Sequence, residues 1–482
     1  MGKSAPPLQT DCHLGGDWCL AKDGRRFEVT DPATGRPIET VADASPVDGL
    51  AAVAAAHNAF EAWSQVAPRQ RGEVLRRAFA LMTERAEELA RLVVAENGKA
   101  LADARGEVAY AAEFFRWYSE EAVRNSGEFV RAPVGTNRIL VLRQPIGVAL
   151  LVTPWNFPAA MLTRKIGPAL AAGCTVVCKP ARETPLTALA ISGILDEAGV
   201  PPGVVNVVPS SRPGPLIDAV LADARVRKLS FTGSTEVGRM LLAKASERVV
   251  NCSMELGGNA PFIVFADADL DAAVAGAMVA KMRNGGEACT AANRFYVEET
   301  VAAEFLARFA TSMAAIRMGN GLDEGVGLGP LVNAESRDKV ARLVAGALDA
   351  GARALVGGSV PDGPGYFYPA TILDRVAPGS SILKEEIFGP VAPIVTFGSE
   401  SEAVEWANDS ILGLVSYVYT GDLARGLRVA EALETGMVGL NRGLVSDPAA
   451  PFGGVKQSGL GREGGHEGMK EYLETKYVAF SW

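Results

Sequence analysis

Apolar side chains recur every three or four residues in the first quarter of the chain, with charged residues between them. One such series comprises Val74, Leu75, Ala78, Phe79 and Met82. This spacing predicts an amphipathic helix, and Gly98 is a typical residue for its end. A second series covers residues 103–124. The first part of the chain is therefore expected to be helical.

From Ile146 onward, short apolar runs alternate with amphipathic stretches. The runs are Val148–Val152, Thr175–Cys178, Val204–Val208 and Lys228–Phe231. Between them, residues 159–172 and 185–198 have helical periodicity. This alternation predicts a parallel sheet wound by right-handed crossovers, with its ligand site beyond the carboxyl ends of the strands.

A second alternating region covers residues 261–436, with helical stretches at 270–282 and 301–316. Ahead of the first region, residues 129–134 and 138–143 have the pattern of a β-hairpin. The chain is thus predicted to be an α/β protein with two α/β domains and a small β element.

The composition narrows the class of protein. Hydrophobic residues make up 48% of the 482 residues and charged residues 21%, as in globular proteins. The net charge of −9 gives no basic footprint for nucleic acid, and no run reaches the ~18 apolar residues of a membrane helix. Residues 1–17 lack the apolar core of a secretory signal, and six cysteines make no disulfide framework, so the cytoplasm is the expected location. Three scattered histidines predict no metal site.

The segment Arg283–Thr290 contains the strongest chemical candidate, Cys289. Gly285 and Gly286 precede it, and two glycines let the backbone approach a ligand and leave the thiol uncrowded. A free thiol is mostly protonated at neutral pH, so a catalytic cysteine needs help from its surroundings. Taken alone, the segment fits either a nucleophile or a buried structural cysteine.

Three further segments place polar groups at the ends of strands. Glu255 lies among apolar residues and glycines, where burial would raise its pKa and suit it to act as a general base. Asn156, in a loop stiffened by two prolines, offers an amide donor to an oxyanion. Gly233 and Ser234 open a helix and can hold a phosphate, without the Gly-x-Gly-x-x-Gly fingerprint. Each segment alone also fits a loop without function.

Taken together and in this order, the segments resemble the aldehyde dehydrogenase superfamily from about residue 10 to the end. The shared motifs are Thr153–Pro158, Lys179–Ala181, Phe231–Thr235, Glu255–Gly258, Gly285–Cys289, Glu386–Pro390 and Pro451–Gly454. The resemblance implies a dinucleotide-binding domain and a catalytic domain, joined by a bridging element that pairs subunits. Their expected bounds are 1–122 with 146–257, then 258–457, and 123–145 with 470–482.

The resemblance implies an enzyme that oxidises an aldehyde by hydride transfer to NAD or NADP. Cys289 would attack the aldehyde carbon, and Asn156 with the Cys289 backbone N–H would stabilise the oxyanion. Glu255 would activate the water that hydrolyses the thioester. The cofactor-binding residues that it implies are Trp155, Lys179, Gly233, Ser234, Glu386 and Phe388.

Within the superfamily, the likeness is greatest to the succinate-semialdehyde dehydrogenases, through Met161–Lys165, Lys281–Asn284 and Gly443–Ser446. That subfamily holds the distal carboxylate of its substrate with two arginines and a serine. Arg164, Arg283 and Ser446 stand at those places, and both arginines are expected to line one entrance. The implied substrate is succinate semialdehyde or a close ω-carboxy aldehyde. Glutarate semialdehyde or a broader range of aldehydes is the alternative.

The residues after Lys179 bear on the choice of cofactor. NAD-using relatives often place a glutamate three residues on, where it binds the adenosine ribose, but this chain has Arg182. An arginine pairs with a 2′-phosphate and cannot accept the ribose hydroxyl protons, which favours NADP. Because Glu183 follows, NAD stays possible.

Two positions depart from the family pattern. Ala291 replaces the second cysteine with which many relatives form a redox-switch disulfide, so no such switch is expected. Arg442, next to Asn441, is unlike the best-known members, and its part in the anion pocket stays open.

Two other kinds of protein could share this fold. A coenzyme-A-acylating enzyme does not need Glu255 to activate water. A non-catalytic binding protein does not need Cys289, Asn156 and Glu255 together. Relatives pair subunits through the hairpin and a carboxyl-terminal strand, here near residues 474–481, so a homodimer or homotetramer is expected. Apart from the semialdehyde substrate, no partner is expected, neither nucleic acid nor membrane.

Overall fold

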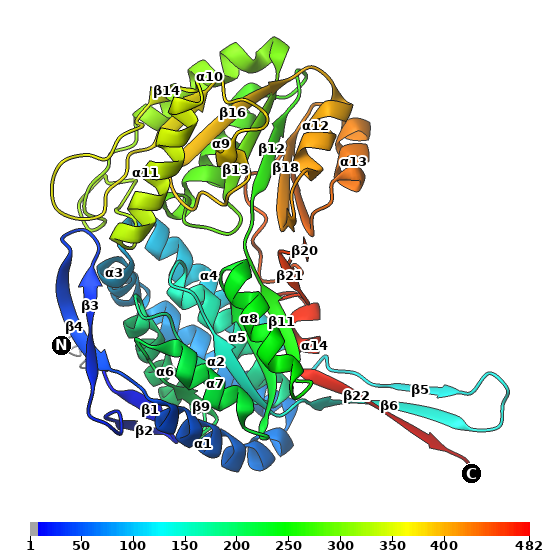
Figure 1. Cartoon of the computed structure of the whole chain (residues 1–482). Helices are drawn as coiled ribbons and strands as arrows, with labels where there is room; N and C mark the ends of the chain where they lie inside the picture. The colour runs from blue at the N-terminus through cyan, green and yellow to red at the C-terminus, as the bar shows by residue number, and fades with distance from the viewer. Residues whose placement is uncertain (1–7) are drawn as a thin grey trace.

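Two β-sheets, one in each half of the molecule, form the frame of the protein (Figure 1). The computed structural model describes residues 8–482, so part of the stretch examined for a secretory signal, residues 1–7, lies outside the described residues. The predicted α/β class is confirmed. Within residues 8–482, no helix is both long and apolar enough to cross a bilayer.

The first sheet has the strand order β2-β1-β9-β8-β7-β10-β11-β21. Its strands are β1 (Cys12–Leu14), β2 (Asp17–Cys19), β7 (Val148–Val152), β8 (Thr175–Lys179), β9 (Val205–Val207), β10 (Val226–Thr232), β11 (Asn251–Glu255) and β21 (Gly459–Leu460). The five central strands, from β9 to β11, are parallel. After β7, the chain adds β8 and then β9 on one side of β7. The next strand, β10, pairs with the other side of β7. Such a reversal opens a crevice for ligands at the carboxyl ends of β7 and β10.

Helices cover both faces of this sheet because its central strands are apolar on both sides. Along β7, Ala149 and Leu151 belong to one apolar cluster, and Val148, Leu150 and Val152 belong to the other. Helices of the first cluster are α2 (Pro68–Glu84), α3 (Ala86–Asn97), α4 (Leu101–Glu121), α5 (Pro158–Ala172) and α6 (Pro185–Glu197). Those of the second are α1 (Pro46–Gln65), α7 (Pro213–Ala222) and α8 (Thr235–Ser246).

The second sheet has the order β14-β15-β16-β13-β12-β18-β19 and is parallel except at β14. Its strands are β12 (Ala260–Val264), β13 (Ala292–Glu298), β14 (Arg353–Val356), β15 (Thr371–Asp374), β16 (Val391–Phe397), β18 (Val415–Tyr419) and β19 (Met437–Leu440). The helices α9 (Leu270–Met282) and α10 (Glu299–Ala314) pack on one face. The opposite face carries α11 (Ala334–Asp349), α12 (Glu400–Asn408) and α13 (Leu423–Ala432).

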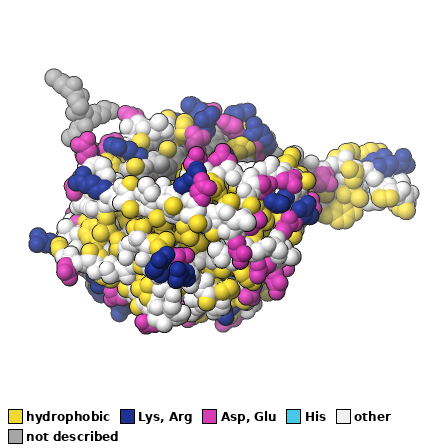
Figure 2. Space-filling model, turned by 90° about the horizontal axis from the view of Figure 1, so that it is seen from above, with side chains coloured by type: hydrophobic (Ala, Val, Ile, Leu, Met, Phe, Trp, Pro, Cys, Tyr) yellow, Lys and Arg dark blue, Asp and Glu magenta, His cyan; other side chains and the backbone are white. Residues whose placement is uncertain are grey.

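A three-stranded antiparallel arm projects from the body of the molecule (Figures 1 and 2). It consists of β5 (Glu128–Arg131), β6 (Arg138–Pro145) and β22 (Leu473–Phe480), with β6 in the centre. Its exposed apolar side chains include Phe129, Val130, Val134, Tyr477, Val478 and Trp482. The space-filling view shows hydrophobic atoms along the arm.

The sequence prediction was wrong in three details. The helix with Val74 ends at Glu84, because the backbone at Arg85 leaves helical geometry, and Gly98 instead caps α3 with a φ of 91°. The hairpin strand expected to reach Val134 ends at Arg131, because a turn follows in which the Gly135 N–H donates to the Ala132 carbonyl. The supposedly helical first part also contains β1, β2, β3 (Arg26–Asp31) and β4 (Arg36–Ala42).

Short elements complete the chain. They are the 3₁₀ turns η1 (Arg283–Gly286) and η2 (Ser381–Leu383), the strands β17 (Leu412–Gly413) and β20 (Val455–Lys456), and the helix α14 (Glu467–Lys470).

Candidate active site

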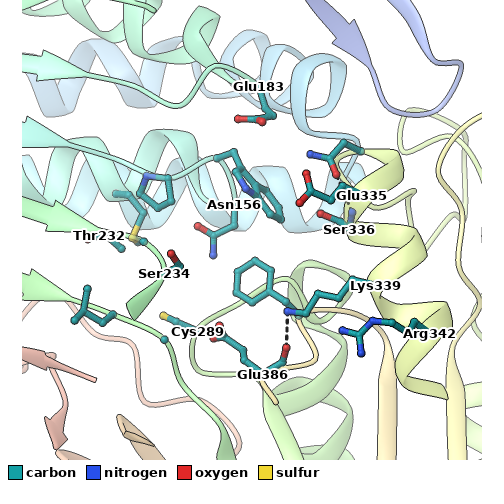
Figure 3. Close-up of a pocket in the computed structure, with 18 residues that line it drawn as sticks. Asn156, Glu183, Thr232, Ser234, Cys289, Glu335, Ser336, Lys339, Arg342 and Glu386 are labelled. Atoms are coloured by element: carbon teal, nitrogen blue, oxygen red, sulfur yellow. Dashed lines mark hydrogen bonds between the residues drawn. The ribbon is translucent and has the colours of Figure 1, made fainter. Parts of the chain in front are cut away.

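A cavity of about 640 Å³ lies where the carboxyl ends of β7 and β10 face the second sheet (Figure 3). Its wall contains seven of the residues selected from the sequence: Trp155, Asn156, Gly233, Ser234, Cys289, Glu386 and Phe388. The wall is completed by the first half of α11, which sequence reasoning did not select. This half contributes Glu335, Ser336, Lys339 and Arg342.

The glycines around Cys289 allow close packing of backbone segments. In η1, Asn284, Gly285 and Gly286 all have positive φ, and a Cβ at Gly286 would lie 2.2 Å from the Gly389 carbonyl oxygen. A Cβ at Gly258 would similarly lie 2.0 Å from the carbonyl oxygen of Cys289. The expectation that the glycines before Cys289 make room for a ligand is thus wrong for Gly286, which makes room for the chain beside Phe388.

The thiol of Cys289 is half-buried at the bottom of the cavity in the view of Figure 3. Burial raises its pKa to about 12, while the positive charges of Arg164 and Arg283 act in the opposite direction. Glu386 and Glu255 raise the pKa further. The thiol therefore keeps its proton at neutral pH, and the two arginines favour the thiolate when it forms.

Asn156 lies in the same wall, on the loop after β7. Its side-chain Nδ2 donates to the carbonyl of Glu287, 3.0 Å away and two residues before Cys289. Its own carbonyl accepts hydrogen bonds from Asn284 Nδ2 at 2.9 Å and from Lys99 Nζ at 2.7 Å. The loop is therefore held from both sides at the position of the amide.

A buried ion pair links the Asn156 loop to helix α5. Lys99 Nζ lies 2.5 Å from Glu107 Oε2, and both side chains are almost fully buried. The other carboxylate oxygen, Glu107 Oε1, accepts from the N–H groups of Ala159 and Ala160 in the first turn of α5. One ion pair thus fixes the Asn156 loop and the helix that follows it.

Glu255 ends β11 and is 3% exposed. Its Oε2 is buried without a hydrogen-bond partner among residues 8–482. Burial, followed by the nearby carboxylate of Glu463, raises the pKa of Glu255 well above its usual value. The positive charges of Arg164 and Lys165 oppose this only in part. The surroundings of Glu255 therefore favour its protonated form.

The pKa of Glu463 is shifted in the opposite direction to that of Glu255. Burial raises its pKa, but Lys165 and Arg164 lower it by more, so the group is ionised. Lys165 Nζ donates to one of its oxygens, and Arg164 Nε lies 2.5 Å from the other. These three residues and Glu255 form one buried cluster of two cations and two carboxyl groups, whose pKa values are shifted in opposite directions.

The three residues expected to bind the substrate carboxylate lie outside the wall of the main cavity. Arg283 and Ser446 are brought together, with Nη1 3.4 Å from Oγ, and Arg283 also lies over the ring of Phe157 at 4.8 Å. Arg164 is fully buried, paired with Glu463 and stacked 4.3 Å from the Phe452 ring. The charge of Arg164 is thus already paired with Glu463, and the expectation that both arginines line one entrance stays a prediction.

Arg442 is exposed, and its Nε donates to the carbonyl of Leu444 at 2.7 Å. It lines a second hollow of about 470 Å³ together with Ser446 and Phe452. The sequence left open whether Arg442 belongs to the anion pocket. The structure places it in this second hollow and not in the wall of the main cavity.

The other expected cofactor residues lie near the far end of the main cavity. Lys179 is 6% exposed at the end of β8, and burial lowers its pKa to about 8. The side chain of Arg182 is 66% exposed and absent from the cavity wall, whereas Glu183 lines it. The two lie 3.7 Å apart, and Figure 3 shows Glu183 at the end away from Cys289.

Hydrogen bonds fix Glu386 and Ser234 in the wall of the cavity. Glu386 Oε1 accepts from the Gly258 N–H at 2.9 Å, and Lys339 Nζ donates to the Glu386 carbonyl at 2.7 Å. Ser234 caps α8 by accepting from the Val237 N–H, and it lines the cavity at the start of this helix.

Sequence reasoning missed Glu463, Lys99 and Glu107. Glu463 stands next to Gly464 and Gly465, the same signal of a carboxylate among glycines that singled out Glu255. Lys99 and Glu107 carry no such signal, because their pairing depends on a turn between two helices. Among residues 8–482, no group of three His, Cys, Asp or Glu side chains could hold a metal ion.

Comparison with known proteins agrees with this geometry. Residues 18–478 match the model of the aldehyde dehydrogenase family. A succinate-semialdehyde dehydrogenase of Paenarthrobacter nicotinovorans is 56% identical over 92% of this chain and 99% of its own, and a glutarate-semialdehyde dehydrogenase of Pseudomonas putida is 47% identical over 99% of both. The crystal structure of an NADP-dependent enzyme of E. coli has a TM-score of 0.97, with 46% identity and 98% of both chains covered. This chain belongs to the aldehyde dehydrogenase family.

Proposed function

We propose that this protein oxidises succinate semialdehyde to the dicarboxylic acid, with NADP as its preferred acceptor. The observation that carries the choice of substrate is the pairing of Arg283 with Ser446, beside the buried Arg164 whose charge acts on Cys289. Two cations near the nucleophile suit a substrate with an aldehyde at one end and a carboxylate at the other. The 56% identical relative carries that substrate in its name.

The main cavity fits a dinucleotide. Gly233 and Ser234 precede the first turn of α8, whose N–H groups and positive dipole end suit a pyrophosphate. A Cβ at Gly257 would crowd Glu386, so this glycine keeps the floor of the cavity open beside a carboxylate that can accept from ribose hydroxyls. Trp155 and Phe388 pack edge to face with ring centres 5.4 Å apart, so Phe388 would lie beside the nicotinamide and Trp155 along the channel of the pyrophosphate. When bound, NADP accepts a hydride from the substrate carbon.

Cys289 is the nucleophile of the proposed mechanism. Its thiolate forms a bond to the aldehyde carbon, and the carbonyl oxygen becomes an oxyanion. Asn156 Nδ2 and the Cys289 N–H donate to that oxyanion, and the Lys99–Glu107 pair keeps the amide in place. Loss of hydride from the carbon leaves a thioester on Cys289.

Glu255 completes the reaction as general base. It acts in its carboxylate form, which burial disfavours by raising its pKa. The carboxylate then takes a proton from water, the water oxygen attacks the thioester carbon, and the sulfur of Cys289 leaves. Aldehyde, water and oxidised cofactor are converted into carboxylate, reduced cofactor and two protons.

Arg182 is the proposed source of the NADP preference. Its side chain is largely exposed and only loosely paired with Glu183, so it is free to turn toward a 2′-phosphate. Glu183 lines the cavity and is the acceptor that would serve the ribose hydroxyls if NAD were bound instead. The NADP-dependent E. coli enzyme supports this assignment.

The arm is the proposed surface for pairing subunits into a homodimer or homotetramer. The rings of Phe129, Phe480 and Trp482 lie within 6.3 Å of one another, on strands that project from the body. A thin ribbon with exposed apolar side chains is poorly stable alone in water, and a second copy would cover it. The expected cytoplasmic location remains a prediction.

The test is a panel of ω-carboxy aldehydes of three to six carbons, with butanal as the uncharged control, against both nicotinamide cofactors. The proposal expects the highest kcat/KM for the four-carbon semialdehyde with NADP. A maximum at five carbons would favour glutarate semialdehyde, which the 47% identical relative carries in its name. Equal activity on butanal would contradict an anion pocket. Product released as free acid without coenzyme A separates the proposal from an acylating enzyme.

A further inference from the structure

Tyr110 lies on α4, and the charges of both Arg164 and Arg283 act on its hydroxyl. Its ring packs edge-on against Phe114, with ring centres 4.8 Å apart. The hydroxyl oxygen is shielded from solvent and has no hydrogen-bond partner in the part of the chain that the structure describes. A buried donor without a partner costs free energy, so its presence calls for an explanation.

Both cations of the substrate side lie next to this tyrosine. The guanidinium of Arg283 lies 5.8 Å from the centre of the Tyr110 ring. Burial raises the pKa of Tyr110, and the charges of Arg164 and Arg283 oppose that rise without cancelling it. The hydroxyl therefore keeps its proton at neutral pH and is available as a donor beside two positive charges.

A second donor in this region is also unused. Arg164 Nη2 is buried and has no hydrogen-bond partner among residues 8–482, although its Nε is paired with Glu463. Arg164 is thus oriented by Glu463 on one side and retains an N–H group on another. Arg283 and Ser446, at 3.4 Å, add further donors. Within the described residues, Tyr110 and Arg164 thus each keep a donor without a hydrogen-bond partner, beside Glu255 Oε2 and Glu463 Oε2 of the buried cluster, two acceptors that also have none. None of the four side chains Tyr110, Arg164, Arg283 and Ser446 is an anion.

We infer that the Tyr110 hydroxyl donates a hydrogen bond to the distal carboxylate of the substrate, alongside Arg164, Arg283 and Ser446. This inference rests on the proposed function, because it concerns the same anion. A carboxylate has two oxygens that can each accept two hydrogen bonds, so it can satisfy the hydroxyl and the guanidinium donors together. Tyr110 would then reject aldehydes that leave its hydroxyl unpaired.

The test compares Tyr110→Phe with the wild-type enzyme at saturating cofactor. We expect kcat/KM for succinate semialdehyde to fall about 10- to 100-fold, mostly through KM, since a hydrogen bond to a charged group is lost. Activity on butanal should change less than twofold. The dissociation constant of the product succinate should rise by a similar factor. The melting temperature should stay level or increase, because the variant removes a buried donor that the free protein leaves unpaired.

Tyr118→Phe is the matched control. Tyr118 lies on the same helix, and its hydroxyl is also buried without a partner among residues 8–482. It packs against Gly468, where an added Cβ would lie 2.2 Å from the hydroxyl oxygen. This variant should retain the kinetics of the wild type on both aldehydes.

The inference would be overturned if Tyr110→Phe kept wild-type kinetics on succinate semialdehyde. It would also be overturned by an equal loss on both aldehydes or by a fall in melting temperature, since both indicate a structural role. If the wild-type enzyme itself does not prefer succinate semialdehyde to butanal, the proposed function fails together with this inference. A wild-type preference that Tyr110→Phe leaves intact contradicts the role of Tyr110 alone.

Discussion

The two sides of the active site are built differently. On the cofactor side, a cavity of about 640 Å³ is lined by short loops at strand ends and by one face of α11, with few ion pairs. On the substrate side, Arg164, Lys165, Glu255 and Glu463 are buried together, and their charges set one another's protonation. The cofactor side is thus organised by backbone shape, and the substrate side by charge. Variants on the substrate side should therefore disturb more than their own contacts.

The largest effect is expected where the two sides meet. Cys289→Ala removes the atom that forms the covalent bond, so oxidation should be abolished while the cofactor side keeps its shape. Fluorescence titration with NADPH should give an unchanged dissociation constant. Appreciable turnover by this variant would contradict the assignment of the nucleophile.

Glu255→Gln should slow steady turnover by about 10²–10⁴, the range for a lost general base. Because Cys289 and Asn156 are untouched, the thioester should still form, and stopped-flow absorbance should show a burst of reduced cofactor before the slow phase. A single slow phase without a burst would indicate that Glu255 acts before hydride transfer.

Arg283→Ala tests the anion site without stranding a buried charge, since Arg283 contacts Ser446 and not a carboxylate. Loss of a desolvated partner costs about 2–5 kcal/mol, so kcat/KM for succinate semialdehyde should fall roughly 30-fold to several thousand-fold. Butanal should be little affected. Arg164→Ala should instead impair both aldehydes, because it leaves Glu463 short of one of its two cations. Equal selectivity in both variants and the wild type would make Arg442 the next residue to replace.

The charge balance also predicts a pH dependence. Burial raises the pKa of Cys289 to about 12, so its reactive thiolate is the minority form at pH 7, and it raises the pKa of Glu255 well above its usual value. The deprotonated form of each group grows about tenfold per pH unit below the pKa of that group. Rates should therefore rise from pH 6 to pH 9. In Glu255→Gln, the rate of the slow phase that follows the burst should increase less with pH than in the wild type. A rate that falls with pH would contradict the directions of both shifts.

The smallest effect is expected at the rim of the cofactor side. Arg182→Ala should reduce kcat/KM with NADP by about tenfold, the loss of one exposed charge-assisted contact, and leave NAD nearly unchanged. Glu183→Gln is the matched variant and should impair NAD more than NADP. The ratio of kcat/KM for the two cofactors measures both, and an unchanged ratio in Arg182→Ala would show that the preference arises elsewhere.

The difference between the two sides also explains what the sequence could predict. Asn156, Ser234 and Glu255 follow or end apolar strands, and parallel strands bring their carboxyl ends to one edge, so local pattern and topology suffice. Four of the five central strands of the first sheet, β7 to β10, were predicted to within two residues. The short N-terminal strands β1 and β2 were missed, because three residues give no usable periodicity.

The substrate side was less accessible to sequence reasoning. Arg164 was found by resemblance, but its pairing with Glu463 depends on a contact between segments 298 or more residues apart. Tyr110 looked like an ordinary residue on the apolar face of a helix, and its hydroxyl matters only because Arg164 and Arg283 lie around it. Side-chain charge networks follow from the tertiary fold and leave little trace in local patterns.

The same separation in sequence has a consequence for how the protein is made. Lys165 leaves the ribosome 298 residues before Glu463, which at usual speeds of synthesis is roughly 15 to 60 s. During that interval, the helix with Arg164 and Lys165 cannot close over its final site without burying two uncompensated cations. The nascent first domain must therefore remain partly open, or hydrated, at its future catalytic centre. The enzyme should acquire its tight core and its reactivity in the same late step.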